Sequence, residues 1–272
     1  MKTSPIILNG FLILVLLVSS CNKNNEAAFT DTPIVEAYLQ NGHYFSVNIS
    51  RQIPFSPNVA IYSSDDIDNL EIIITCNGIS SVLEAVGGGI YADSSIIVTE
   101  GDEYTLTFTY NDKTVHAYTY VPTKPVNVTQ SVTSITMDKM DSTSGPPSGS
   151  MPDPIQINWD NTDESYYLIV VENLESDPEP IRDFGDDGDA PERIFRKSPT
   201  NSSYEEINPI EFEYFGTYRV VLFHVLPDYA SLYEQNSTSS QNLTNPSTCI
   251  ENGYGIFTGL NSDTLYIEVI EN

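Results

Sequence analysis

The feature that most constrains the fold of this chain is a strict alternation of large and small side chains at residues 104–110, which are Tyr-Thr-Leu-Thr-Phe-Thr-Tyr. A period of two residues predicts a β-strand with one buried face. Asn111 and Asp112 follow, and Val115 and Ala117 then resume the alternation, so the segment predicts a two-strand hairpin. A chain built from such segments folds into packed sheets.

The first half of the chain contains seven short segments of this kind, bounded by Gly, Pro, Asn and Asp: 34–40, 44–51, 70–76, 80–85, 95–99, 104–110 and 114–120. Their number and spacing predict a β-sandwich. Pro122 and Pro125 follow the last segment, and proline cannot continue a strand ladder. We therefore expect an N-terminal β-sandwich domain at 32–122 and a second domain at 123–272.

The second half contains segments that resemble strands of fibronectin type III and related immunoglobulin-like domains. Residues 155–159 end in Trp159, and a segment that begins with two tyrosines follows at 166–172. Residues 217–226 look like the strand that would pair with it, and 264–270 like the closing strand. These segments predict a second sandwich of that type.

One short helix is expected in the second domain, at residues 228–235 with Asp228 as its N-cap. The predicted fold class is therefore all-β, with two tandem β-sandwich domains, immunoglobulin-like or fibronectin type III-like, and one short helix in the second.

The N-terminus has the features of an exported lipoprotein. Its apolar run from Ile6 to Val18 is shorter than the ~20 residues that span a bilayer, so residues 1–20 predict a signal peptide. The end of this segment, Val-Ser-Ser before Cys21, resembles the bacterial lipobox. That resemblance implies a mature chain that begins with a lipidated Cys21 and a polar tether at 21–31. Ordinary cleavage nearby is the alternative.

The charge of the chain excludes several partners. It has 38 acidic and 11 basic residues and a net charge of -27, and no cluster of Lys and Arg that would hold a phosphate backbone. We expect no nucleic acid partner. The same sign disfavours anionic lipid surfaces.

The most acidic segment is an insertion expected at 173–203. Within it, four carboxylates surround two glycines, a composition that suits Ca²⁺: Asp183, Asp186, Asp187 and Asp189. The spacing does not match an EF-hand, so a weak Ca²⁺ site and a solvated acidic loop both stay open. No other cofactor is expected.

Two cysteines remain beyond Cys21. Cys76 and Cys249 are compatible with one disulfide in an exported chain, and equally with two separately buried thiols.

No catalytic motif accompanies the three histidines, His43, His116 and His224, so we expect no enzymatic activity. Aromatic side chains at loop or helix tips are candidates for partner binding, with core packing as the alternative. They are Tyr229, Tyr233, Tyr254 and Phe257.

Five features together resemble a Bacteroidota outer-membrane lipoprotein family known only as a domain of unknown function. They are the lipobox, Val35–Leu39, Ser50-Arg51 with Pro54-Phe55, Gly101–Tyr104 leading to Val121-Pro122, and Asn252–Phe257. Such proteins are typically encoded beside TonB-dependent receptors. The resemblance implies a lipid-anchored protein of the outer membrane, at the cell surface or the periplasmic face, that assists a receptor in ligand capture. A structural or adhesive surface protein that binds Ca²⁺ through the acidic loop is the alternative.

Overall fold

The computed structural model describes residues 31–52, 65–141, 151–183, 191–236 and 249–272. It shows an all-β sandwich fold with few helical residues, as the sequence predicts. The predicted signal peptide, Cys21 and most of the tether lie outside the described residues. In the described ranges, none of the helices is long and apolar enough to cross a membrane.

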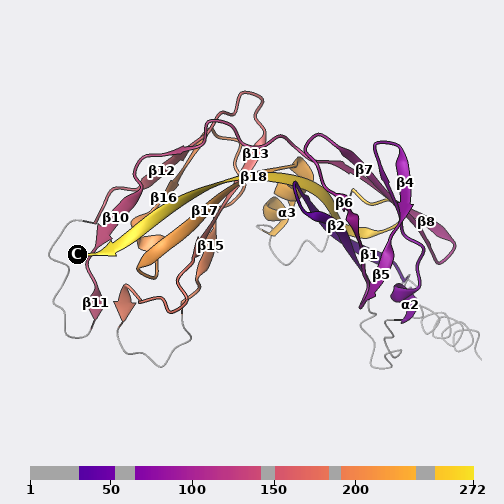
Figure 1. The fold of residues 1–272 in the computed structure, drawn as a ribbon, viewed down its shortest axis with the longest axis horizontal. Helices are drawn as coiled ribbons and strands as arrows, with labels where there is room; N and C mark the ends of the chain where they lie inside the picture. The colour runs from indigo at the N-terminus through magenta and orange to yellow at the C-terminus, as the bar shows by residue number, and fades with distance from the viewer. Residues whose placement is uncertain (1–30, 53–64, 142–150, 184–190, 237–248) are drawn as a thin grey trace, which may run out of the picture.

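Two lobes make up the molecule, and each has its own hydrophobic core (Figure 1). In the N-terminal lobe, two sheets enclose the first core. One sheet contains β5 (Glu84–Gly87), β6 (Ile90–Ile97), β2 (Tyr44–Arg51) and β1 (Pro33–Gln40), in that order. The other contains β4 (Ile79–Val82), β3 (Ile73–Cys76), β7 (Glu103–Tyr110) and β8 (Lys113–Tyr120). A single helical turn, α2 (Asp65–Asp68), precedes β3.

The predicted hairpin is confirmed. Strand β7 buries Tyr104, Leu106 and Phe108. Tyr110 pairs with Lys113 across a two-residue turn. Asn111 and its neighbour take positive φ angles of 48° and 60°, as the primed hairpin turns require.

The segment predicted as one strand at 80–85 is instead two strands in two different sheets. Leu83 separates β4 from β5, and its side chain is buried. Its N–H donates to the carbonyl oxygen of Ile72, so the chain leaves one sheet there and enters the other. A period-two pattern marks buried positions but does not show which sheet a strand joins, and this prediction was therefore wrong in its extent.

The C-terminal lobe is a sandwich with immunoglobulin-like strand order. Its larger sheet has the order β15 (Ile194–Arg196), β13 (Tyr166–Asn173), β17 (Gly216–Val225) and β18 (Tyr254–Glu271), and the parallel strand β10 (Ser134–Met137) also pairs with β18. The smaller sheet contains β16 (Tyr204–Ile207), β12 (Ile155–Asn158) and β9 (Thr129–Gln130). A short pair, β11 (Met140–Asp141) with β14 (Arg182–Asp183), lies beside them. Trp159 is buried, with its ring centroid 5.3 Å from that of Tyr167.

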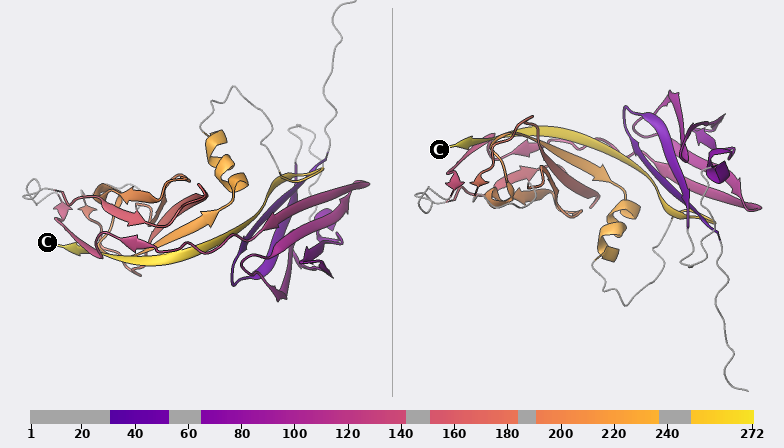
Figure 2. Two further views of the ribbon diagram at one scale, coloured as in Figure 1. Left: turned by 90° about the horizontal axis from the view of Figure 1, so that it is seen from above. Right: turned by 90° about the horizontal axis from the view of Figure 1, so that it is seen from below.

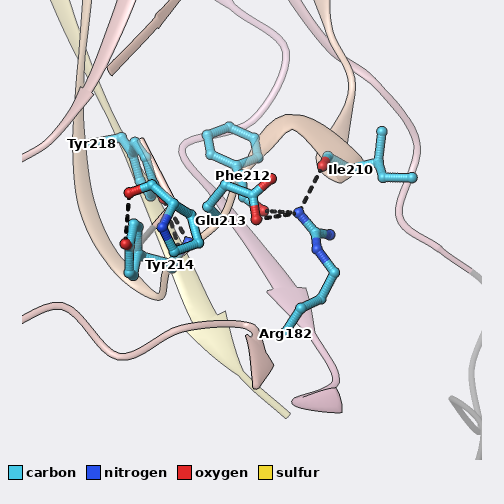
Figure 3. Close-up of polar contacts among 7 residues, drawn as sticks. Arg182, Ile210, Phe212, Glu213, Tyr214 and Tyr218 are labelled. Atoms are coloured by element: carbon cyan, nitrogen blue, oxygen red, sulfur yellow. Dashed lines mark hydrogen bonds and ion pairs between the residues drawn. The ribbon is translucent and has the colours of Figure 1, made fainter. Parts of the chain in front are cut away.

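A tyrosine closes one corner of this sandwich (Figure 3). The Tyr218 hydroxyl donates to the carbonyl oxygen of Tyr214 at 2.9 Å and accepts from the N–H of Tyr214 at 3.0 Å. Beside it, Arg182 forms an ion pair with Glu213 at 2.8 Å. The Arg182 guanidinium also donates to the carbonyl oxygens at Ile210 and Phe212, next to the short 3₁₀ helix η1 (Pro209–Glu211). Immunoglobulin-like sandwiches commonly fix this corner with a tyrosine.

Strand β18 belongs to both lobes (Figures 1 and 2). Its first half pairs in parallel with β1, from Tyr254 opposite Ile34 to Leu260 opposite Gln40. Its second half pairs antiparallel with β17, up to Val269. The predicted closing strand at 264–270 is therefore part of β18, and the prediction was wrong only in its extent. Gly255 permits the close approach of β18 to β1.

The predicted boundary at 122/123 is not confirmed. Ile250 and Phe257, close to the C-terminus, pack in the first core with residues of β1 and β7. One continuous sheet also runs through both lobes by way of β18. The last strand, β18, is therefore part of the N-terminal lobe, in which it pairs with the first strand, β1.

The expected helix is confirmed as α3 (Pro227–Asn236), which begins one residue earlier than predicted. Asp228 lies in its first turn rather than at the N-cap. The Asp228 Oδ1 atom accepts a hydrogen bond from Thr258 Oγ1 at 2.9 Å, so this carboxylate attaches the helix to β18.

Candidate functional site

A pocket of about 470 Å³ lies at the end of the N-terminal lobe where β1 and β18 begin; we call it the terminal pocket. Its volume falls within the ~300–1,000 Å³ of ordinary small-molecule sites. Three segments line it: residues 31–33 at the start of β1, the turn between β7 and β8, and the start of β18. The lining residues are Asp31, Thr32, Pro33, Tyr110, Asn111, Lys113, Asn252, Gly253 and Tyr254.

Local backbone conformation brings the two asparagines to this pocket. Asn111 and Asn252 both take positive φ angles, of 48° and 57°, which asparagine tolerates better than most residues. Between Asn252 and Tyr254 the space is tight, because a Cβ atom on Gly253 would lie 2.8 Å from Ile250 Cγ2. Glycine at 253 therefore lets the chain enter β18 next to the pocket.

Hydrogen bonds hold the wall of the terminal pocket. Asp31 Oδ2 accepts from the Tyr110 hydroxyl at 2.8 Å and pairs with Arg51 Nη1 at 3.3 Å. Burial, and then the hydrogen bond to the Asp31 carboxylate, raise the pKa of Tyr110 to about 12. Asp31 Oδ1 is buried and has no partner among the described residues.

Both asparagine side chains are oriented by main-chain contacts. Asn111 Nδ2 donates to the carbonyl oxygen of Asp31 at 3.3 Å, and Asn252 Nδ2 donates to that of Thr114 at 2.8 Å. Each amide nitrogen is thus directed to the backbone. Each Oδ1 atom is left as an acceptor that makes no hydrogen bond to another described residue.

The positive charge at this pocket is unusual for so acidic a chain. Six basic residues form ion pairs with carboxylates: Arg51 with Asp31, Lys124 with Asp263, Lys139 with Glu179, Arg182 with Glu213, Lys197 with Glu211 and Arg219 with Glu172. Lys113 makes no ion pair with any described carboxylate, although the chain has 38 acidic residues. Its exposed ammonium group therefore stays available at the terminal pocket.

A second cluster of aromatic side chains surrounds α3. Figure 1 shows this helix between the two lobes. The Tyr229 ring is 6.0 Å from that of Tyr38 on β1 and 5.9 Å from that of Tyr233. Burial, and then the neighbouring Tyr233 hydroxyl, raise the pKa of Tyr229. A smaller pocket of about 220 Å³ adjoins the cluster and is lined by Tyr166, Ser198, Pro199, Ala230 and Tyr233.

The structure separates the four predicted partner-binding aromatics. Tyr254 lines the terminal pocket, and Tyr233 lines the smaller pocket. Tyr229 packs between rings of both lobes. Phe257 is fully buried in the first core, so the expectation that it presents a surface to a partner was wrong.

The two cysteines are free thiols. Cys76 Sγ donates to Asp102 Oδ2 at 3.7 Å, and Cys249 Sγ lies 3.7 Å from Asp228 Oδ2. The structure therefore contains no Cys76–Cys249 disulfide. The alternative of two buried thiols also fails, because Cys249 is exposed and Cys76 is partly exposed.

Of the four aspartates considered for Ca²⁺, only Asp183 is described, as an exposed residue of β14. Asp186, Asp187 and Asp189 lie outside the described residues. Within the described ranges, no three His, Cys, Asp or Glu side chains gather as a metal site would require. The Ca²⁺ site stays a prediction.

Sequence reasoning identified Tyr254 but missed Asp31, Asn111 and Lys113. Asn111 was noticed only as a turn residue, and nothing local marks Lys113. These residues lie close together because β18 pairs with β1. Neither segment alone carries a sequence pattern that predicts this pairing.

Comparison of the chain with protein-family models and with curated proteins finds no match.

Proposed function

We propose that this protein is a non-catalytic ligand-capture module, anchored in the outer membrane by a lipid on Cys21 and assisting a TonB-dependent receptor. The observation that carries the proposal is the position of the terminal pocket. Its lining begins with Asp31, the last residue of the predicted tether.

The length of the predicted tether supports a position of this pocket near the bilayer. The chain from Cys21 to Asp31 extends at most about 35 Å, at ~3.3–3.6 Å per residue. A lipid on Cys21 would hold the mouth of the pocket within that distance of the membrane. Tethering raises the effective concentration of the module near a barrel in the same bilayer, so weak contacts suffice.

The continuity of β18 supports the same role. A strand shared by both lobes joins their sheets without a flexible linker at that point (Figure 2). The terminal pocket and the C-terminus lie at opposite ends of this strand (Figure 1). Such a module could place its pocket towards a receptor and its C-terminal lobe away from it. The resemblance to lipoproteins encoded beside TonB-dependent receptors supports a receptor of this class as the partner.

The test is a crosslinked pull-down from native membranes with an affinity tag after Asn272, at the end distant from the terminal pocket. We expect a TonB-dependent barrel to be recovered in stoichiometric amount. The matched control is Cys21→Ser, which removes the acceptor of the lipid and should release the protein from the membrane fraction and lose the barrel. Recovery of the lipoprotein alone, or of the barrel equally with Cys21→Ser, would overturn the proposal.

A further inference from the structure

The terminal pocket contains polar groups of two kinds that have no partner among the described residues: a positively charged donor and neutral acceptors. The donor is the Lys113 ammonium group, which forms no ion pair with a described residue. An ammonium group beside a pocket favours a carboxylate or phosphate, to which charge-assisted hydrogen bonds are about twice as strong as neutral ones.

Asn111 and Asn252 favour the opposite kind of ligand group, a hydrogen-bond donor. Their Nδ2 atoms are engaged by main-chain carbonyl oxygens, so each amide is left with an Oδ1 acceptor. An acceptor is satisfied by a ligand N–H or O–H donor. A ligand that fills the pocket therefore needs an anionic end and a donor end.

The charge of the whole molecule selects among such ligands. With a net charge of -27, the protein repels a simple anion and attracts a simple cation at long range. Lys113 disfavours a simple cation at the pocket itself. A ligand that carries both charges is net neutral, so it avoids the long-range repulsion and still satisfies both kinds of group.

The rings of the pocket suit an ammonium end as well. Tyr110 and Tyr254 both line it. A cation near the face of a tyrosine ring gains about 0.5–1 kcal/mol at exposed sites. The Asp31 carboxylate does not compete strongly for the same ammonium group, because its Oδ2 atom is paired with Arg51 and Tyr110 and its unpartnered Oδ1 atom is buried.

We propose that the terminal pocket binds a compact zwitterion, with the anionic group at Lys113 and the ammonium group at the Oδ1 atoms of Asn111 and Asn252. Two sources carry this chemistry: a short peptide or amino acid, and the phosphoethanolamine headgroup of a lipid. The inference rests on the proposed capture function and deepens it by naming the ligand class.

The experiment is calorimetric titration of the full mature protein in detergent with four probes. They are alanyl-alanine, its N-acetyl derivative, its C-terminal amide, and glycerophosphoethanolamine, whose phosphodiester carries a single negative charge as in the lipid headgroup. We expect at least one of the two zwitterions to bind. For a binding dipeptide, removal of either charge should weaken the affinity by about tenfold or more, since each charge-assisted contact contributes on the order of 1.4 kcal/mol.

The matching variant is Lys113→Gln, at an exposed residue beside a hairpin turn where folding is not at risk. It should weaken zwitterion binding about tenfold or more and abolish the preference for the free carboxylate over the amide. Lys124→Gln is the control, because Lys124 pairs with Asp263 outside this pocket, and it should leave binding unchanged.

Binding of alanyl-alanine supports a peptide or amino acid source, and binding of glycerophosphoethanolamine supports a headgroup source. Failure of both zwitterions to bind, equal binding of the N-acetyl derivative, or unchanged binding in Lys113→Gln would overturn the inference. The titration contains no receptor. Its failure is therefore distinguishable from failure of the pull-down, which tests the accessory role.

Discussion

Gly255 of β18 lies so close to Val35 of β1 that a Cβ atom added to Gly255 would be 2.0 Å from the Val35 carbonyl oxygen. Gly255 also takes a φ of +101°, a conformation that other residues rarely adopt. The parallel pairing of the first and last strands therefore depends on glycine at this position. That pairing builds one wall of the terminal pocket and joins the two lobes.

Gly255→Ala should lower the free energy of unfolding by about 2–5 kcal/mol, because backbone strain and overpacking each cost ~1–3 kcal/mol. Urea denaturation followed by circular dichroism measures the change. Gly42→Ala is the control: it also has a positive φ, of +84°, but nothing lies within 4 Å of the added atom. Its cost should be about 1–2 kcal/mol, that of the φ angle alone. If both variants lose the same free energy of unfolding, the result would contradict the close approach of Gly255 to Val35.

Phe257→Ala should destabilise the N-terminal lobe although the residue is near the C-terminus, because Phe257 is fully buried in the first core. The expected loss is about 3–5 kcal/mol. Trp159 is the single tryptophan and lies in the second core, so its fluorescence reports on the C-terminal lobe. Because β18 runs through both lobes in one continuous sheet, the Trp159 transition should shift together with the far-ultraviolet circular dichroism transition. A Trp159 transition that stays at its wild-type midpoint would show that the lobes unfold separately.

Tyr218→Phe should destabilise the C-terminal lobe by about 1–3 kcal/mol. The change removes the hydroxyl that bonds both the N–H and the carbonyl oxygen of Tyr214, and it leaves two buried backbone groups without that partner. Thermal unfolding monitored by Trp159 fluorescence measures the effect. Tyr266→Phe, at a side chain that is 55% exposed, should change the midpoint little. If both variants unfold at the same temperature, the Tyr218 hydroxyl does not stabilise this corner of the sandwich.

Alkaline pH should weaken the N-terminal lobe partly through Tyr110. Its pKa is raised from an ordinary value of 10 to about 12, because the folded state buries the phenol and bonds it to Asp31. The folded state thus holds this proton more tightly than the unfolded chain does. The corresponding stability is fully present below pH 10 and is lost as the pH rises through about 12.

Urea unfolding of wild type and Tyr110→Phe at pH about 9 and about 11.5 tests this dependence. The variant should be less stable than wild type at the lower pH, because it lacks the bond to Asp31. The difference in the free energy of unfolding between wild type and Tyr110→Phe should be smaller at the higher pH. A constant difference across this range would show that the Tyr110 hydroxyl does not titrate between the folded and unfolded states as described.

Much of the fold follows from local patterns. The alternation in β7 predicts which side chains it buries, and Asn111 with its neighbour predicts the hairpin turn. The segment that ends in Trp159 and the tyrosine-led segment after it predict two strands of an immunoglobulin-like sandwich. These elements could be predicted because the buried face of a strand and the φ preferences of a turn are properties of neighbouring residues.

The sequence by itself determined that this protein is an acidic all-β chain with two groups of strands, and it predicts a lipoprotein-type leader at residues 1–20. The tertiary structure decided how the groups are joined and where a pocket forms. Glycine at 255 has the same local propensity in a turn and in a closely packed strand, and only the carbonyl oxygen of Val35 decides between them. Lys113 likewise became a candidate ligand-binding residue only because the pairing of β18 with β1 places Asn252 and Tyr254 at the same pocket. Strand pairing between distant segments depends on backbone groups that every residue carries, so no local pattern encodes the partner.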